Sequence, residues 1–363
     1  MAAQPLLFGA PGRARRASSQ SLDFQGRLGR PPAGDPRGPV PGVVVLTRAA
    51  DREVDELSLR LAVRGVPMLR LDSDRAAGLD LTWDVLDGIV ETTEGRFEPR
   101  AVWLRYFSGA SVPSHGSGGL DDYVRQQWVA WSRMLLAMER CHVVNSTATC
   151  AAPDRVAQLA GARRAGIRVP ATVVTSRPST AADRIPGDGD LVVKSLGLHF
   201  VEPVPGQLRT LSPRRMSRAH VRAAKVAEPA PVMVQEYVPC TSRLRVYAVG
   251  GELIAFASGA PGADAQFVDD PFSDSHTDSR RDGEDRHVVP VPVPDGLRRP
   301  LESLARRWQL DVAAFDLLET PDGPVFLEVD TACDWLGHER RAGVSSVTDA
   351  VAGLLEHHFR AIR

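Results

Sequence analysis

The sequence predicts an α+β fold in which a small α/β unit precedes a larger unit of hairpins and helices. A strand–helix–strand pattern over residues 42–72 predicts a pair of parallel strands joined by a helix. After residue 170, several hairpins alternate with helices, which favours α+β architecture over a doubly wound sheet. The chain shows no fixed-period repeat.

Composition limits the classes of function. The chain has 363 residues, of which 43% are hydrophobic, and a net charge of -1, so we expect a soluble protein of two or three structural units. It lacks the basic excess typical of nucleic-acid binding and the apolar run of about 18 residues that a membrane span needs. The cysteines, which lack the paired spacing of a zinc site, favour a reducing cytoplasm; they are Cys141, Cys150, Cys240 and Cys333. Nothing in the composition excludes a homodimer.

Residues 1–40 are rich in Pro, Gly, Arg and Ser and show no periodicity, so we predict a disordered tail. The first twenty-two residues contain Arg and Ser but no acidic residue, as mitochondrial transit peptides do. The Pro and Gly residues would break the amphipathic helix that such a peptide needs. A flexible arm or a mis-set start codon is the favoured interpretation.

The elements of the first unit follow from apolar periodicity and glycine stops. The helix of the opening pattern closes at Gly65. The predicted elements are strands at 42–47, 66–72 and 101–106 and helices at 52–65 and 121–140.

The second unit alternates short strands and helices around a mobile charged loop at 261–287. Its predicted strands and hairpins cover 168–176, 190–196, 231–238, 243–258 and 311–330. Its predicted helices cover 153–166, 217–226, 294–309 and 347–360.

The hairpin at 311–330 carries the first chemical signal. Its turn, ETPDGP, suits a three-residue loop of type I plus glycine bulge, with Gly323 in the left-handed conformation. That loop would pair Leu318 with Phe326 and Asp316 with Glu328. A two-residue turn would shift the register by one and place Asp316 opposite Val329.

The odd-length loop places Asp316, Glu328 and Asp330 on one face, where they would raise one another's pKa unless a cation is present. Mg²⁺ fits, because it takes carboxylate and phosphate oxygens; calcium would need more ligands. Removing Asp316 or Glu328 should therefore slightly stabilise the metal-free protein. Two alternatives stay open: ordinary solvent-facing strand residues, and metal-free hydrolysis by a carboxylate pair.

Lysine is rare in this chain. Only Lys194 and Lys225 occur, against 42 arginines. Lys225 fits a solvated helix surface, whereas Lys194 ends an apolar strand, where a charge needs a partner. A compact ammonium suits phosphate oxygens. The alternative is a lysine at a strand end that reaches water.

The second unit contains, in this order, Lys194 on a strand and the segments PVMVQEYV, RLRV, FDLL and FLEVD. The order of these motifs resembles the ATP-grasp superfamily and, more closely, the microviridin-type graspetide synthetases, and the resemblance covers residues 43–361. The resemblance implies an α+β ATP-grasp fold in which two subdomains clamp ATP. It implies a pre-ATP-grasp α/β domain at 41–148 and an ATP-grasp domain at 149–363, with a lid subdomain at about 172–238 and a catalytic subdomain at about 239–361.

The resemblance also implies roles for single residues, with ATP and Mg²⁺ as cofactors. Lys194, with Arg155 at the position of another family lysine, would contact the nucleotide phosphates, and Glu236, Tyr237 and Val238 would form the adenine hinge. Asp316, Glu328 and Asp330 would hold magnesium. Arg245, assisted by Arg280 in an Asp-x-Arg match, would stabilise the transferring phosphoryl group.

Several positions depart from the family pattern. Asp330-Thr331 stands where the family has Asn-Pro, which leaves the metal site intact with one more negative charge. Cys240 and Arg243 replace a family Lys and Asp, which puts the ribose or substrate contact in doubt. We expect Cys333 to be inert and Trp335 to be a core or lid residue rather than a substrate stacker; His199 is an exposed loop residue or touches phosphate.

The resemblance implies ATP-dependent formation of side-chain esters or amides in a ribosomal precursor peptide, through an acyl phosphate. Two alternatives remain. One is a small-molecule carboxylate–amine ligase, such as an amino-acid or dipeptide ligase. The other is an ATP-grasp protein that binds its ligands without turnover.

Overall fold

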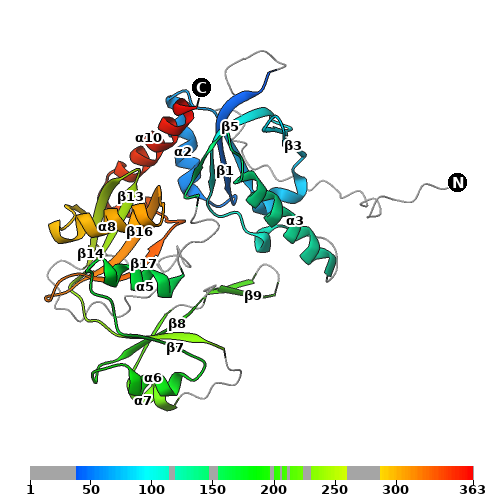
Figure 1. The fold of residues 1–363 in the computed structure, drawn as a ribbon. Helices are drawn as coiled ribbons and strands as arrows, with labels where there is room; N and C mark the ends of the chain where they lie inside the picture. Colours follow the sequence, from blue (N-terminus) through cyan, green and yellow to red (C-terminus); the bar gives the residue numbers. More distant parts are fainter. Residues whose placement is uncertain are drawn as a thin grey trace.

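The computed structural model describes residues 38–113, 119–146, 154–196, 200–204, 207–210, 213–223, 230–259 and 287–362. Within them the chain forms three sheets of four to six strands and a separate hairpin, surrounded by helices (Figure 1). The predicted α+β class is confirmed. Most of the predicted tail and all of the predicted charged loop at 261–287 except His287 lie outside the described residues. The same holds for Arg280, His199 and Lys225.

The N-terminal sheet has the order β2-β1-β5-β4-β3, with β6 added on β5. As predicted, β1 and β2 are parallel, and the helix between them starts at the Asp51 cap and is followed by Gly65 with φ 68°. The sequence analysis missed the antiparallel hairpin β3–β4. The elements are β1 (Val40–Thr47), α2 (Arg52–Val63), β2 (Met68–Asp72), β3 (Leu81–Asp84), β4 (Ile89–Thr92), β5 (Gly95–Leu104), α3 (Gly119–Leu135) and β6 (His142–Val144).

A four-stranded antiparallel sheet of order β11-β8-β12-β7 contains Lys194 and the predicted hinge. Two short helices, α6 and α7, pack on it through a small apolar core that includes Ala181, Val221 and Val234. Its elements are β7 (Thr172–Thr175), α6 (Pro178–Arg184), β8 (Leu191–Ser195), β11 (Arg214–Met216), α7 (Arg218–Ala223) and β12 (Val232–Glu236). The hairpin β9 (Phe200–Val204) and β10 (Gln207–Thr210) stands beside it (Figure 1).

A five-stranded antiparallel sheet of order β15-β14-β13-β16-β17 lies between α8 and α10 (Figure 1). Side chains alternate along β13: Val246 joins the core formed with α5 and α8, and Tyr247 joins the core formed with α10. Its elements are α5 (Arg155–Arg164), β13 (Ser242–Val249), β14 (Glu252–Gly259), β15 (His287–Val291), α8 (Asp295–Arg307), β16 (Val312–Glu319), β17 (Val325–Asp330), α9 (Leu336–Ala342) and α10 (Ser346–Ala361).

One apolar core joins the N-terminal sheet to the five-stranded sheet. It contains Val43 and Leu57 from the N-terminal unit, Ala314 from the sheet, and Val351 from the C-terminal helix. All four side chains are fully buried. The core therefore crosses the predicted boundary at residue 148, and the division into domains stays a prediction.

The β16–β17 hairpin confirms one predicted pair and contradicts another. Asp316 pairs with Glu328, as predicted, but Leu318 pairs with Val325 rather than with Phe326. The register changes between Asp316 and Leu317, so that Leu327 is the extra residue of a bulge. The bulge, and not the loop alone, brings Asp316 opposite Glu328.

Among the described residues, no helix is long and apolar enough to cross a membrane.

Candidate active site

Three charged residues lie in one row across the five-stranded sheet. Arg245 on β13 pairs in register with Asp316 on β16, which pairs in turn with Glu328 on β17. The Arg245 Nη1 atom donates to both carboxylate oxygens of Asp316 at 2.9 and 2.8 Å. Such two-oxygen contacts fix both partners in orientation. The row therefore presents an oriented cation beside two carboxylates.

Asp330 joins this row from two residues further along β17. Its Oδ2 accepts from Arg245 Nη2 at 3.0 Å, and its Oδ1 accepts from the Ala332 amide at 3.0 Å. Arg245 thus bridges Asp316 and Asp330, and its buried Nε makes no hydrogen bond among the described residues. The three predicted metal ligands share the site, but their oxygens are not all within 4.8 Å of one another.

Burial and charge act in opposite directions on this row. Burial raises the pKa of Asp316, which Arg245 opposes and Glu328 and Asp330 reinforce. Burial alone would lower the pKa of Arg245, but the Asp316 and Asp330 carboxylates hold it well above its usual value. Glu328 is the most exposed of the three carboxylates, at 36% against 25% for Asp316 and 30% for Asp330.

Two further cations face the row from other elements. Arg155, the first residue of α5, places Nη1 at 3.5 Å from Glu328 Oε2. Lys194 on β8 is only 5% exposed, and burial lowers its pKa to about 8, against the attraction of Glu328 and Asp316. Arg155 lowers this pKa further. Lys194 thus lies within electrostatic range of the carboxylates, as predicted, although its strand belongs to a different sheet.

The predicted hinge begins at Glu236, the last residue of β12, and continues through Tyr237 and Val238. The Glu236 amide donates to the Ala171 carbonyl and the Tyr237 amide to the Asp190 carbonyl, both at 2.9 Å. These two N–H groups are therefore already used. The Val238 amide is different, because it donates to no acceptor in the described part of the chain. A ligand that binds at the hinge would form hydrogen bonds with this amide and with the neighbouring carbonyl groups.

Gln158, which the sequence analysis did not single out, holds β17 in place. Its side chain accepts from the Val329 amide at 2.9 Å and donates to the Val329 carbonyl at 3.3 Å. These two bonds replace a neighbouring strand at the sheet edge, between Glu328 and Asp330. The signal in the sequence that could have identified Gln158 was a glutamine inside the pattern of a predicted helix.

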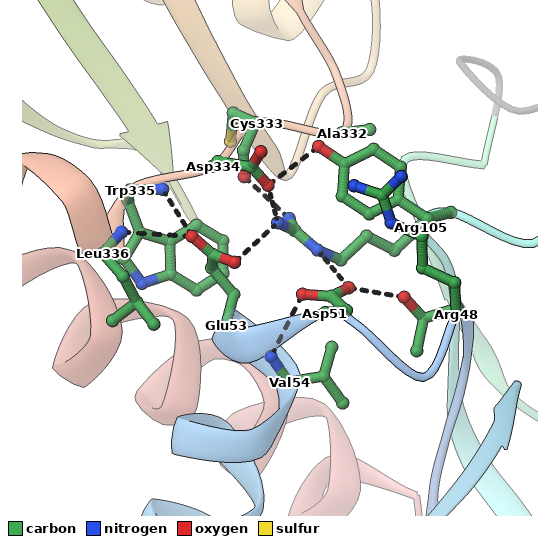
Figure 2. Close-up of polar contacts among 12 residues, drawn as sticks. Arg48, Asp51, Glu53, Val54, Arg105, Ala332, Cys333, Asp334, Trp335 and Leu336 are labelled. Carbon is green, nitrogen blue, oxygen red and sulfur yellow. Dashed lines mark hydrogen bonds and ion pairs between the residues drawn. The ribbon is translucent and has the colours of Figure 1, made fainter. Parts of the chain in front are cut away.

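Arg105 is the second residue that was missed, and it holds the loop after β17 (Figure 2). The Arg105 side chain is fully buried. It donates from Nε to Asp51 Oδ2 at 2.8 Å, from Nη1 to the Cys333 carbonyl at 2.7 Å, and from Nη2 to Asp334 Oδ1 at 2.7 Å. Arg105 therefore ties the N-terminal unit to the segment that directly follows Asp330.

The residues around Arg105 complete this junction. Glu53 Oε1 accepts from the amides of Trp335 and Leu336, both at 3.2 Å, and so caps the start of α9 (Figure 2). The Tyr106 hydroxyl donates to Asp334 Oδ1 at 2.8 Å. The Asp51 carboxylate holds the pKa of Arg105 above its usual value, although burial acts in the opposite direction.

The expectations for Cys333 and Trp335 are confirmed. Cys333 is fully buried, and burial raises the pKa of its thiol to about 12, so that it is an inert thiol. Trp335 is fully buried and stacks on Trp103 with ring centroids 6.4 Å apart. Cys240, one of the two positions near the hinge that differ from the family pattern, is buried in a small core with Val238 and Leu318. Its side chain is therefore not exposed to a bound substrate.

Comparisons with known proteins find similarity to proteins named as ligases. No family model matches the chain. A probable alpha-L-glutamate ligase of Aliivibrio salmonicida is 27% identical over 252 residues, which is 68% of this chain and 72% of that protein. A probable alpha-L-glutamate ligase 2 of Shewanella amazonensis is 28% identical over 214 residues, 58% of this chain and 65% of the relative.

Solved structures match more of the chain. The macrocyclase MdnC of Microcystis aeruginosa, bound with precursor peptide MdnA, matches with a TM-score of 0.72 and 19% identity, over 87% of this chain and 99% of that one. The chain has the fold of the ATP-grasp ligases. A RiPP-associated ATP-grasp ligase of Chryseobacterium gregarium, in complex with ADP and a leader and core peptide, matches at 0.68 and 19%, over 88% and 97%. The predicted ATP-grasp fold is thus confirmed.

Proposed function

We propose that the protein is an ATP-dependent ligase that activates a carboxylate as an acyl phosphate and joins it to a hydroxyl or amine. The observation that carries this proposal is the meeting of Lys194, Arg155 and Arg245 with three carboxylates, within an ATP-grasp fold. Cations aimed at phosphate oxygens and carboxylates that suit magnesium are the parts that phosphoryl transfer uses. No protein side chain need become covalently attached.

The proposed reaction has two steps. A substrate carboxylate oxygen attacks the γ-phosphorus of ATP, the bond to the bridging oxygen breaks, and ADP leaves. The acceptor oxygen or nitrogen then attacks the acyl carbon, inorganic phosphate leaves, and the acceptor proton passes to solvent. Because this chemistry needs charge stabilisation and alignment, the enzyme contributes position and electrostatics.

The residues have separate proposed roles. Lys194 and Arg155 bind the nucleotide phosphates, and the hinge at 236–238 binds the adenine edge. Arg245, which the carboxylates hold in one orientation, faces the transferring phosphoryl group. Arg280, which lies outside the described residues, is proposed to assist it.

The carboxylates fit magnesium by their chemistry, because they offer hard oxygen ligands on one face of the sheet. Glu328 is the carboxylate not bonded to Arg245, and its longer contact, 3.5 Å, is with Arg155, so it can turn toward an ion by leaving only that pair. Asp316 and Asp330 are held by the guanidinium and would complete the site. When bound, magnesium would neutralise phosphate charge during transfer.

We propose a precursor peptide as the substrate, with Asp or Glu as donor and Ser, Thr or Lys as acceptor. Support comes from two of the structural matches, a macrocyclase solved with a precursor peptide and an ATP-grasp ligase solved with a leader and core peptide. The sequence relatives named as probable glutamate ligases support a second candidate, which joins a free amino acid to a carboxylate. The two candidates share the nucleotide site and differ only in the acceptor.

The first prediction separates the roles of Glu328 and Asp316. In EDTA, Glu328→Gln should change the free energy of unfolding by less than about 0.5 kcal/mol, because its pair with Arg155 is partly exposed. Asp316→Asn should lower it by about 1–3 kcal/mol, because Arg245 loses a charged partner. This revises the sequence-based expectation that either change slightly stabilises the metal-free protein.

Both variants should lose about a hundredfold or more of magnesium-dependent ADP formation. Urea unfolding in EDTA and an ADP-release assay measure the two properties. Glu319→Gln is the matched control for charge loss, because Glu319 lies on β16, the strand that carries Asp316. If Glu328→Gln kept full turnover, Glu328 would not be a metal ligand.

The second prediction concerns the peptide. With ATP and magnesium, a short peptide encoded beside the gene and containing Thr or Ser with Asp or Glu should lose one water for each linkage formed. The intramolecular acceptor benefits from a high effective molarity. Mass spectrometry with fragmentation locates the link, and mild alkaline hydrolysis distinguishes esters from amides. An unchanged peptide, together with ATP-dependent joining of free glutamate, would favour the second candidate.

A further inference from the structure

A cluster of two histidines and one aspartate lies at the far end of β16 from the proposed nucleotide site. His142 comes from β6, Asp311 from the residue before β16, and His358 from α10. Their ligand atoms all lie within 4.8 Å of one another, the only such set of three metal-binding side chains in the described part of the chain. Asp311 lies five positions before Asp316, a distance of about 16 Å at ~3.3 Å per residue along the strand.

The hydrogen bonds of the cluster leave ligand atoms available. Asp311 Oδ2 accepts from the Asn145 amide at 2.9 Å and lies 3.2 Å from His142 Nε2. No described group donates to Asp311 Oδ1. His358 Nε2 is a buried atom with no hydrogen-bond partner among the described residues. A buried, unpartnered imidazole nitrogen is costly unless a ligand satisfies it.

We propose that His142, Asp311 and His358 form a binding site for a divalent transition metal of the zinc type, which fastens the C-terminal helix to the junction of the two large sheets. Two imidazoles and one carboxylate are a zinc-like ligand set that leaves a fourth position for water. Magnesium and calcium would bind poorly, because they prefer oxygen ligands. The site is separate from the proposed magnesium site, and its three protein ligands come from β6, the residue before β16 and α10.

The cluster must rearrange to accept the ion. The rings of His142 and His358 are stacked, with centroids 3.4 Å apart and planes 5° apart. A metal ion lies in the plane of each imidazole that binds it, so one ring has to leave the stack. A surface cavity of about 670 Å³, lined by both rings, gives the ring this space.

The cavity also indicates the fourth ligand. The Cys141 thiol lines it, but this thiol donates to the Met138 carbonyl. It is therefore already engaged, and water from the open cavity takes the fourth position. Two carboxylates, Glu98 and Glu139, line the same cavity together with one cation, Arg140, so that the acidic side chains outnumber the basic one.

Zinc binding to the full-length, untagged protein tests the proposal. The protein is titrated with Zn²⁺ in a calorimeter, in a buffer whose large excess of Mg²⁺ saturates the carboxylate site. One equivalent of Zn²⁺ should bind. The melting temperature of the protein should rise when Zn²⁺ is added. His358→Gln and His142→Gln should each lose at least about tenfold in Zn²⁺ affinity. His357→Gln is the matched control, because His357 is the exposed neighbour of His358 on the same helix.

Several results would overturn the proposal. They are no zinc binding by wild type, wild-type affinity in both histidine variants, or an equal loss in His357→Gln. Circular dichroism establishes that each variant is folded, and the two ligand variants lie on different elements, so one folding failure does not decide the test. Unchanged ADP release by His358→Gln without added zinc is also expected, since the site lies away from the nucleotide.

Discussion

Replacing Arg105 with Met should lower the free energy of unfolding by about 3–5 kcal/mol, a large part of a typical domain's stability. The change leaves the Asp51 carboxylate fully buried without its cation and removes the bonds to the Cys333 carbonyl and to Asp334. Removing one partner of a buried ion pair lowers stability far more than replacing both partners with apolar side chains, because it leaves a buried charge without compensation. Urea unfolding followed by circular dichroism measures the loss.

Arg48→Met is the control for this prediction. Arg48 is exposed and only stacks over Tyr106, with its guanidinium carbon 4.5 Å from the ring centroid, so its loss should lower stability by about 0.5–1 kcal/mol. Arg105→Lys should lie between the two, because an ammonium keeps the charge but cannot form all the bonds of the planar fork. Equal stability losses for Arg105→Met and Arg48→Met would contradict the role of Arg105 at this junction.

Replacing Lys194 with Met should reduce ATP turnover by about 10²–10³-fold with only a small change in stability. The ammonium is nearly fully buried, and burial lowers its pKa, so an apolar side chain of similar length suits the same space and removes the cost of burying a charge. Arginine should substitute poorly, because its planar fork differs from a compact ammonium. ADP release and thermal unfolding of the same preparations give the two measurements.

Arg222→Met is the matched control within the same layer. Arg222 pairs with Asp183 at 2.9 Å on the α6–α7 surface, with half of its side chain exposed, and should leave turnover unchanged. If Lys194→Met released ADP at the wild-type rate, Lys194 would be removed from the nucleotide site. A large fall in melting temperature would make Lys194 a structural residue instead.

Local patterns predicted much of the fold. The strand–helix–strand start, the β16–β17 hairpin and the terminal helix follow from apolar periodicity and from stops such as Gly65, because these signals are contained in short segments. The pairing of Asp316 with Glu328 was predicted for an incomplete reason. Turn chemistry can specify a loop, but the bulge at Leu327 depends on packing along the whole strand pair.

The supporting residues of the site could not be predicted from the sequence. Arg105 bonds to Asp334, 229 positions later, and Gln158 replaces a strand for Val329, 171 positions later. Neither partner is visible from local spacing. Asn145 is a similar case, since its side-chain Nδ2 donates to the backbone carbonyls of both Val312 and Thr331. The sequence predicted side chains that carry charge in the site, and tertiary structure was needed to find those that hold them.

The most direct test of the ligase proposal follows the substrate oxygen. An acyl-phosphate intermediate transfers one carboxylate oxygen to inorganic phosphate each time a linkage forms. With a peptide or acceptor substrate whose carboxylates carry a heavy-oxygen label, the phosphate released should contain one labelled oxygen for each water lost from the product. Phosphate that is released without label, while the product still forms, would contradict carboxylate activation by ATP in this site.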